Sequence, residues 1–191
     1  MIRSGSRMLR AYIAVCLLSI VAACAPETKI TTNKMPDYVG NPKRLFVFSR
    51  IEGDFGDEFT PTFNDMFVKI AKECGADAEL VTTLPESSDN QDSMAKMKAF
   101  NPDTVLSITR GAGLATRPDM LTPSSVTVAR TYNLQLIELP SQKTVWRANA
   151  VFRRGSGLVK GSDRGQTLAI EITDRMKSDG IFRSCLARKP A

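Results

Sequence analysis

Residues 132–147 read YNLQLIELPSQKTVWR, and this stretch decides the fold. Apolar and polar residues alternate before the turn Pro140-Ser141-Gln142-Lys143, and they alternate again after it. Alternation with period 2 is typical of a strand with one buried face, and two such runs around a short turn predict an antiparallel hairpin. The pattern begins at Val126 and continues to Phe152, so both strands of the hairpin are expected to be long.

Upstream of this hairpin the sequence alternates between strand and helix patterns. Short apolar runs typical of strands buried on both faces occupy residues 45–48, 78–81 and 105–108. Helical periodicity occupies residues 60–74, 93–100 and, after the hairpin, 162–178. Helical crossovers between the first three strands make them parallel. The sequence therefore predicts an α/β fold of order β-α-β-α-β-β-β-α, in which three parallel strands are extended by the antiparallel hairpin and helices pack on the mixed sheet.

The amino terminus is typical of a bacterial lipoprotein signal peptide. Residues 1–23 contain three arginines, an apolar segment and small residues leading to Cys24. The string Val21-Ala22-Ala23-Cys24 matches a lipobox, whose cysteine is acylated and becomes the mature amino terminus. Acyl chains would hold the protein on a membrane, and Ala25 favours the outer membrane by analogy with enteric lipoproteins. The alternatives are a plain signal peptide or an uncleaved anchor, although the apolar segment is shorter than the roughly 20 residues that span a bilayer.

Removal of this signal changes the charge of the protein. It takes away three arginines and no acidic residue, so the formal net charge falls from +6 to +3. Binding of nucleic acid requires a clustered basic patch rather than a modest overall excess. No nucleic-acid partner is therefore expected.

The segment after the signal lacks apolar periodicity and contains three prolines. Residues 24–43 are therefore expected to form a lipidated, flexible tether with an end-to-end distance of about 25 Å. Residues 44–188 follow as a single α/β domain.

Two cysteines remain once Cys16 leaves with the signal and Cys24 is acylated. Cys74 and Cys185 are both expected at the edge of the sheet opposite the carboxyl ends of the parallel strands. An even number of cysteines in the oxidising periplasm predicts a disulfide between them. Two buried free thiols are the alternative.

The carboxyl ends of the strands in an open α/β sheet form a rim at which ligands tend to bind. Four connections are expected at this rim, and the one over residues 110–123 is expected to be a long loop of the kind that is often functional. The glycine-rich stretch 155–161 resembles a phosphate loop, but the order Lys160-Gly161 does not match one, and a plain connector is the alternative. The candidate residues for binding a ligand or partner at the rim are Arg110, Arg117, Arg153, Arg154, Lys160 and Arg164.

The chain contains no histidine. This excludes Ser-His-Asp and Cys-His catalysis and every histidine metal site. Acidic residues crowd the loop after the first strand, but their spacing matches no EF-hand, and a solvated loop is the simpler interpretation. We therefore expect no catalytic residues, no metal site and no cofactor.

The hairpin pattern Leu134-Gln-Leu-Ile-Glu138, followed by a turn and Val145-Trp146-Arg-Ala148, is similar to one in envelope lipoproteins. These resemble the amino-terminal domain of TolB and include the LpoB and CsgG types and single-domain lipoproteins. Glu138 stands where the pattern usually has aspartate, and Pro140-Ser141-Gln142 replaces its glycine turn. The resemblance implies a binding or assembly role, with no catalytic residues to carry over.

The sequence thus predicts a non-catalytic, lipid-anchored periplasmic adaptor or assembly lipoprotein of the bacterial outer membrane. Its partners would be the membrane, through acyl chains on Cys24, and an envelope protein or further copies of itself. The alternative is a binding module for an anionic envelope ligand, such as a glycan or lipid phosphate.

Overall fold

The computed structural model describes residues 27–51, 55–82, 89–118, 125–154 and 159–186. The six strands of its sheet are β1 (Glu27–Lys34), β2 (Arg44–Ser49), β3 (Asp77–Thr82), β4 (Thr104–Pro118), β5 (Ser125–Glu138) and β6 (Lys143–Arg153). The helices are α2 (Phe59–Glu73), α3 (Asp89–Phe100), α4 (Gly161–Ser178) and the short α5 (Arg183–Leu186).

The sheet has the strand order β1-β6-β5-β4-β2-β3. Strands β2, β3 and β4 are parallel, and β5 and β6 continue the sheet as an antiparallel hairpin. The predicted fold class is therefore confirmed. We call the edge at the carboxyl ends of the parallel strands the rim, and the opposite edge the base.

The segment that we expected to be a flexible tether is not one. Residues 27–34 form β1, which pairs with β6 in antiparallel orientation along its whole length. Its alternate residues face the helices, and Ile30 packs against the core. Residues 24–26 of the predicted tether lie outside the described residues. Over residues 27–34 the prediction of a flexible coil was wrong, because the apolar periodicity of β1 is almost absent and hydrogen bonds to β6, rather than burial of apolar side chains, hold this strand in place.

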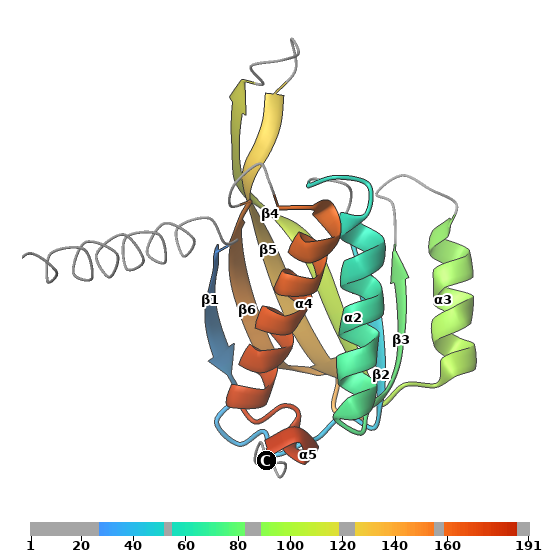
Figure 1. The fold of residues 1–191 in the computed structure, drawn as a ribbon. Coiled ribbons are helices and arrows are strands. Elements are labelled where there is room, and N and C mark those ends of the chain that lie inside the picture. The colour runs from blue at the N-terminus through green and yellow to red at the C-terminus, as the bar shows by residue number, and fades with distance from the viewer. Residues whose placement is uncertain (1–26, 52–54, 83–88, 119–124, 155–158, 187–191) are drawn as a thin grey trace, which may run out of the picture.

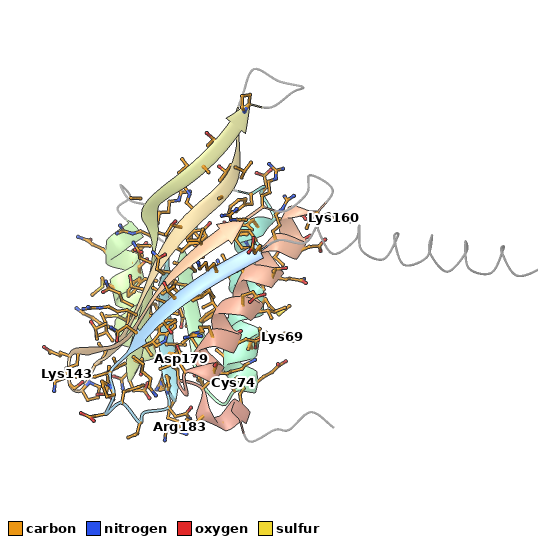
Figure 2. All side chains as sticks on the ribbon, turned by 90° about the vertical axis from the view of Figure 1, so that its left-hand side faces the viewer. Lys69, Cys74, Lys143, Lys160, Asp179 and Arg183 are labelled. Atoms are coloured by element: carbon orange, nitrogen blue, oxygen red, sulfur yellow. A yellow bond between two sulfur atoms is a disulfide. The ribbon has the colours of Figure 1, made fainter. Side chains whose placement is uncertain are left out.

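The helices cover the two faces of the sheet unequally (Figure 1). Helices α2 and α4 lie side by side along one face, over the core. Turning the molecule by 90° shows α3, in green, on the opposite face (Figure 2). There the Phe100 ring of α3 packs against Phe46 of β2, with the ring centroids 5.8 Å apart. None of the described helices covers β1, β5 and β6 on this second face.

Trp146 connects the core to the base of the molecule. Its side chain is buried, and the indole Nε1–H donates a hydrogen bond of 2.8 Å to the Asp179 carboxylate just after α4. Asp179 also lies 3.3 Å from the guanidinium of Arg175, which in turn donates to the hydroxyl of Thr32 on β1. This chain of contacts fastens β6, α4 and β1 together, with Asp179 near the base (Figure 2).

The segment between β1 and β2 wraps around the base instead of extending into solvent. Tyr38 is 7% exposed, and the ring packs so closely over Gly40 that a Cβ atom at Gly40 would lie 2.6 Å from it. Burial raises the pKa of the Tyr38 phenol to about 12, and the carboxylates of Glu138 and Asp103 act in the same direction.

The raised pKa of Tyr38 predicts a loss of stability at high pH. Because the unfolded phenol ionises near pH 10 and the folded one near 12, the folded state holds its proton more tightly, so the stabilisation is complete below pH 10 and is lost as the pH rises toward 12. The free energy of unfolding should fall by on the order of 2 kcal/mol across this range on account of Tyr38. Urea unfolding of the protein and of Tyr38→Phe between pH 9 and 12, values chosen to bracket the two pKa values, measures this as the difference between the two proteins. Parallel curves for the two proteins would contradict it.

A disulfide joins Cys74, immediately after α2, to Cys185 in α5. The two residues are 111 positions apart in the sequence, and their Cα atoms are 4.9 Å apart. Nearby, the Asn41 amide donates to Ser184 and accepts from the backbone N–H of Arg183. The base therefore holds the segment before β2, the end of α2 and the end of the described chain in one place.

Candidate interaction surface

The rim is supported from beneath by an aromatic cluster. Phe55, Phe59 and Phe152 are all buried, and the ring centroids of Phe55 lie 5.0 Å from those of Phe59 and Phe152. The cluster joins the loop before α2, the start of α2 and the end of β6. The packed rings therefore form a buried apolar layer beneath the rim.

Arg164, which we expected to bind a ligand, is buried beneath the rim. Its side chain is 2% exposed, and its guanidinium donates to the carbonyl oxygens of Arg154, at 3.0 Å, and Phe55, at 3.4 Å. Burial lowers the pKa of Arg164, and the neighbouring positive charge of Arg154 acts in the same direction. Arg164 thus donates to the backbone on both sides of the rim, which favours a structural role over the predicted binding of an external ligand or partner.

The glycines around the start of α4 serve helix packing. A Cβ atom at Gly161 would lie 3.2 Å from the carbonyl oxygen of Phe55. A Cβ atom at Gly165 would overlap the carbonyl oxygen of Phe59 and lie 3.0 Å from the amide nitrogen of Phe63. The backbone of α2 and its preceding loop thus occupies the space beside the first turn of α4. This explains the glycines of 161–165 without a phosphate, and residues 155–158 lie outside the described part.

The other predicted basic residues are distributed along the rim. Arg153 is exposed at the end of β6, and Lys160 is exposed immediately before α4 (Figure 2). Arg154 is half-buried, and its Nε has no hydrogen-bond partner among the described residues. Arg110 is exposed on β4. Arg117 also belongs to β4, but its side chain lies outside the described part.

The most prominent feature of the rim is a two-stranded arm, which we define as residues 111–118 of β4 and 125–130 of β5. It projects well beyond the helices in both views (Figures 1 and 2). The pairing of β2 with β4 ends at Ile108, and that of β6 with β5 ends at Ala129. Most of the arm therefore has no third strand beside it.

The prediction of a long loop over 110–123 was wrong, since β4 extends to Pro118 and β5 begins at Ser125.

A bulge rich in glycine sets the direction of the arm. The register between β4 and β5 shifts between Arg110 and Leu114, so that Gly111 to Gly113 oppose little more than Thr131. A Cβ atom at Gly111 would lie 2.8 Å from the Thr131 side chain, and one at Gly113 would overlap its hydroxyl. Glycine is thus required for β4 to fold this closely over β5, and a bulge of this kind bends the strand.

Most of the exposed residues described on the arm are small or apolar. Ala112, Leu114, Ala115 and Thr116 are all exposed, and Leu114 is 50% exposed. The arm segments contain arginine but no aspartate or glutamate. The alternation at Val126 and Val128 predicted the β5 side of the arm, whereas the β4 side, with its small residues Ala112, Ala115 and Thr116, carries no comparable apolar pattern.

The sheet face without helices is polar. Along it the Asn149 amide donates to the Asn133 carboxamide oxygen at 2.9 Å, and the Thr109 hydroxyl donates to the Asn133 backbone at 3.4 Å. A shallow hollow of about 430 Å³ lies here, lined by Thr31, Thr32, Asn33, Thr109, Asn133, Leu134, Gln135, Arg147, Ala148 and Asn149. Such a composition is normal for a sheet face in contact with water.

The described residues contain no group of three or more carboxylate or cysteine side chains placed to hold a metal ion. Of the helices in the part of the chain that the structure describes, none combines the length and apolar character of a membrane span. Cys24, the predicted lipidation site, lies outside the described residues, as do Glu52 and Asp54 of the acidic loop.

No protein-family model matches the chain, and no curated protein matches it in sequence. Among solved structures, a PelC dodecamer from Paraburkholderia phytofirmans is similar in fold. One crystal form, of a variant, gives a TM-score of 0.49 with 16% identity over 76% of this chain and 95% of that one. A second form gives 0.47 with 13% identity over 76% and 94%. A Xanthomonas campestris protein assigned to DUF330 gives 0.38 with 12% identity over 80% and 91%. Because every score is below 0.5, no role of those proteins is transferred from them.

Proposed function

We propose that this chain is a non-catalytic, lipid-anchored adaptor or assembly lipoprotein of the bacterial outer membrane that binds an envelope protein through the β4–β5 arm. The observation that carries the proposal is the arm itself. It is a long, bent, two-stranded projection whose exposed residues include Leu114 and no carboxylate.

The physical argument for a partner concerns the stability of the arm. An isolated two-stranded hairpin is at best marginally stable in water, and among the described residues no strand pairs with the outer edge of β4 over residues 111–118. Exposed edges of this kind are favourable sites for another chain to pair. Docking of a partner would cover both the edge and the apolar surface around Leu114.

The lipid anchor would place the arm near the membrane. Glu27, the first residue of β1, pairs with Arg153 at the rim. Only Ala25 and Pro26 separate β1 from Cys24, and the three Cα–Cα steps from Cys24 to Glu27 span at most about 11 Å. An acylated Cys24 would therefore hold the rim, and the arm with it, close to the lipid surface. This short reach supports a partner in or on the same membrane.

The alternative, an anionic ligand at the rim, has less support. Of the candidate residues around the start of α4, Arg164 donates to backbone carbonyls, which leaves Arg153, Arg154 and Lys160 for an anion. The backbone of the loop before α2 also occupies the space beside the start of α4. We therefore favour a protein partner.

Replacement of Leu114 by aspartate tests the proposal. Because this side chain is 50% exposed, the free energy of unfolding should change by less than about 0.5 kcal/mol. A charge in the centre of a docked apolar contact should nevertheless reduce partner recovery about ten-fold, which corresponds to a loss of about 1.4 kcal/mol. The measurement is pull-down of the full-length lipoprotein from membranes after cross-linking in cells, with co-purified proteins quantified.

The matched control is Ile170→Asp. Ile170 is 41% exposed on α4, on a helix surface away from the arm, and this variant should recover the partner as well as the natural protein does. Equal recovery by Leu114→Asp and the natural protein would rule out the arm as the binding surface. Recovery of only the bait from the natural protein would argue against the adaptor role altogether.

A further inference from the structure

The two outer strands of the sheet present open backbone edges. In the described part of the chain, β1 pairs only with β6 and β3 pairs only with β2. Neither strand contains proline, and neither pairing shows a register shift. Natural proteins usually protect edges with prolines, bulges or covering segments. Among the described residues, neither edge of this sheet is paired with a further strand.

A groove beside β3 adds side-chain recognition to its open backbone. The groove has a volume of about 390 Å³ and lies between β3 and α2. Its apolar floor consists of Ala78, Leu80 and Val68, and the charged residues at its margin are Asp65, Lys69 and Glu79. An incoming strand would find both unpaired backbone groups and a partly apolar surface there.

The directions of the strands determine which edge strands of two copies can pair. Strand β3 runs parallel to β2 and β4, and the three antiparallel pairings from β4 to β1 leave β1 running opposite to β3. Two copies anchored on one membrane have the same orientation, so β1 of one would meet β3 of the next in antiparallel fashion. Antiparallel pairing of β3 with β3, or of β1 with β1, would place the anchored ends on opposite sides.

The side chains of the two edges are complementary in one register. Ile30 of β1 and Ala78 of β3 both lie on the sheet face that carries the core. When these two residues are opposite each other, Lys29 is opposite Glu79 on the other face. A slip of one residue would move every side chain to the opposite face of the sheet. Ile30 can therefore lie opposite Ala78, and Lys29 opposite Glu79, only in registers that keep these faces.

We infer that copies of this chain assemble edge to edge, with β1 of one copy pairing antiparallel to β3 of the next and Lys29 facing Glu79. The inference rests on the proposed function for the common membrane orientation of the copies. The contact joins two different surfaces, so its repetition generates a ring, or a filament if the rotation does not close. The occupant of the β3 groove is then the β1 strand of a second copy.

Engineered cysteines test this pairing in the full-length, membrane-anchored protein. One copy carries Lys29→Cys with one affinity tag, and a co-expressed copy carries Glu79→Cys with another. Since residues opposite each other in an antiparallel pair have Cβ atoms about 5 Å apart, a covalent dimer bearing both tags is expected on non-reducing gels. Each variant expressed alone should give no covalent dimer. The absence of the mixed dimer, or dimers from either variant alone, would overturn the inference.

A charge exchange provides the second test. Lys29→Glu or Glu79→Lys places like charges opposite each other and should reduce the oligomer fraction about five-fold in native electrophoresis of detergent extracts. The double variant should restore that fraction, and Lys72→Glu, an exposed change at the end of α2, should leave it unaltered. Failure of the double variant to restore assembly would overturn the inference. Recovery of the partner by these edge variants, compared with Leu114→Asp, shows separately whether the proposed function holds.

Discussion

Loss of the Cys74–Cys185 disulfide is expected to lower the free energy of unfolding by about 4 kcal/mol. The bridge closes a loop of 111 residues, which includes every element from β3 to α5. Cross-linking over so long a loop removes much of the conformational freedom of the unfolded chain. A single domain has a total stability of only about 5–15 kcal/mol, so this loss would unfold a large fraction of the protein near its growth temperature.

Urea unfolding of the Cys74→Ala, Cys185→Ala double variant measures the effect, because alanine leaves no lone thiol to form other disulfides. The natural protein after reduction should unfold at the same urea concentration as the double variant. Glu73→Gln, an exposed change next to the bridge, is the control and should alter stability by no more than about 0.5 kcal/mol. A loss below about 1 kcal/mol in the double variant would show that the bridge contributes little to folding.

The sequence predicted those parts of the fold that bury large apolar side chains at regular spacing. The hairpin alternates through Leu134, Leu136 and Trp146, all of which are buried in the core. Helix α2 carries Phe63 and Phe67 at helical spacing, and both are fully buried. Such patterns are set locally, so one sequence is enough to recognise them.

Strand β1 was not predicted from the sequence. Its sequence ETKITTNK contains only one large apolar residue, Ile30, because β1 is an edge strand with one face open to water. Its place is determined by hydrogen bonds to β6, a strand more than a hundred positions away in the chain. Long-range pairing of this kind leaves no periodic signal in the strand itself.

The candidate binding residues were only partly predictable for the same reason. Arginines near a glycine-rich connection indicate an anion site when the sequence is considered alone. The roles of Arg164 and Gly165 depend on how closely α4 approaches α2, which no local pattern reports. The phenylalanines of α2 predict a buried helix face, but not that the backbone of Phe59 fills the space beside Gly165.

Gly165→Ala is expected to destabilise the protein by about 3 kcal/mol, although alanine is the stronger helix former by about 1 kcal/mol. Gly165 is buried in the first turns of α4, where the helix packs on α2. The added Cβ would overlap the carbonyl oxygen of Phe59 and lie 3.0 Å from the amide nitrogen of Phe63. Both atoms belong to the backbone of α2, so no change of side-chain rotamer relieves the overlap. The helices must separate, and the aromatic cluster beneath the rim must loosen with them.

The sign of this effect distinguishes close packing from helix propensity. Gln166→Ala, at the next and exposed position of α4, should be neutral or stabilising by a few tenths of a kcal/mol, which gives the propensity term without the clash. Thermal and urea unfolding of both variants provide the comparison. A Gly165→Ala protein as stable as the natural one would mean that α4 and α2 are farther apart than the structure places them. The glycines at the start of α4 would then need another explanation, and the case for an anion at this helix terminus would regain weight.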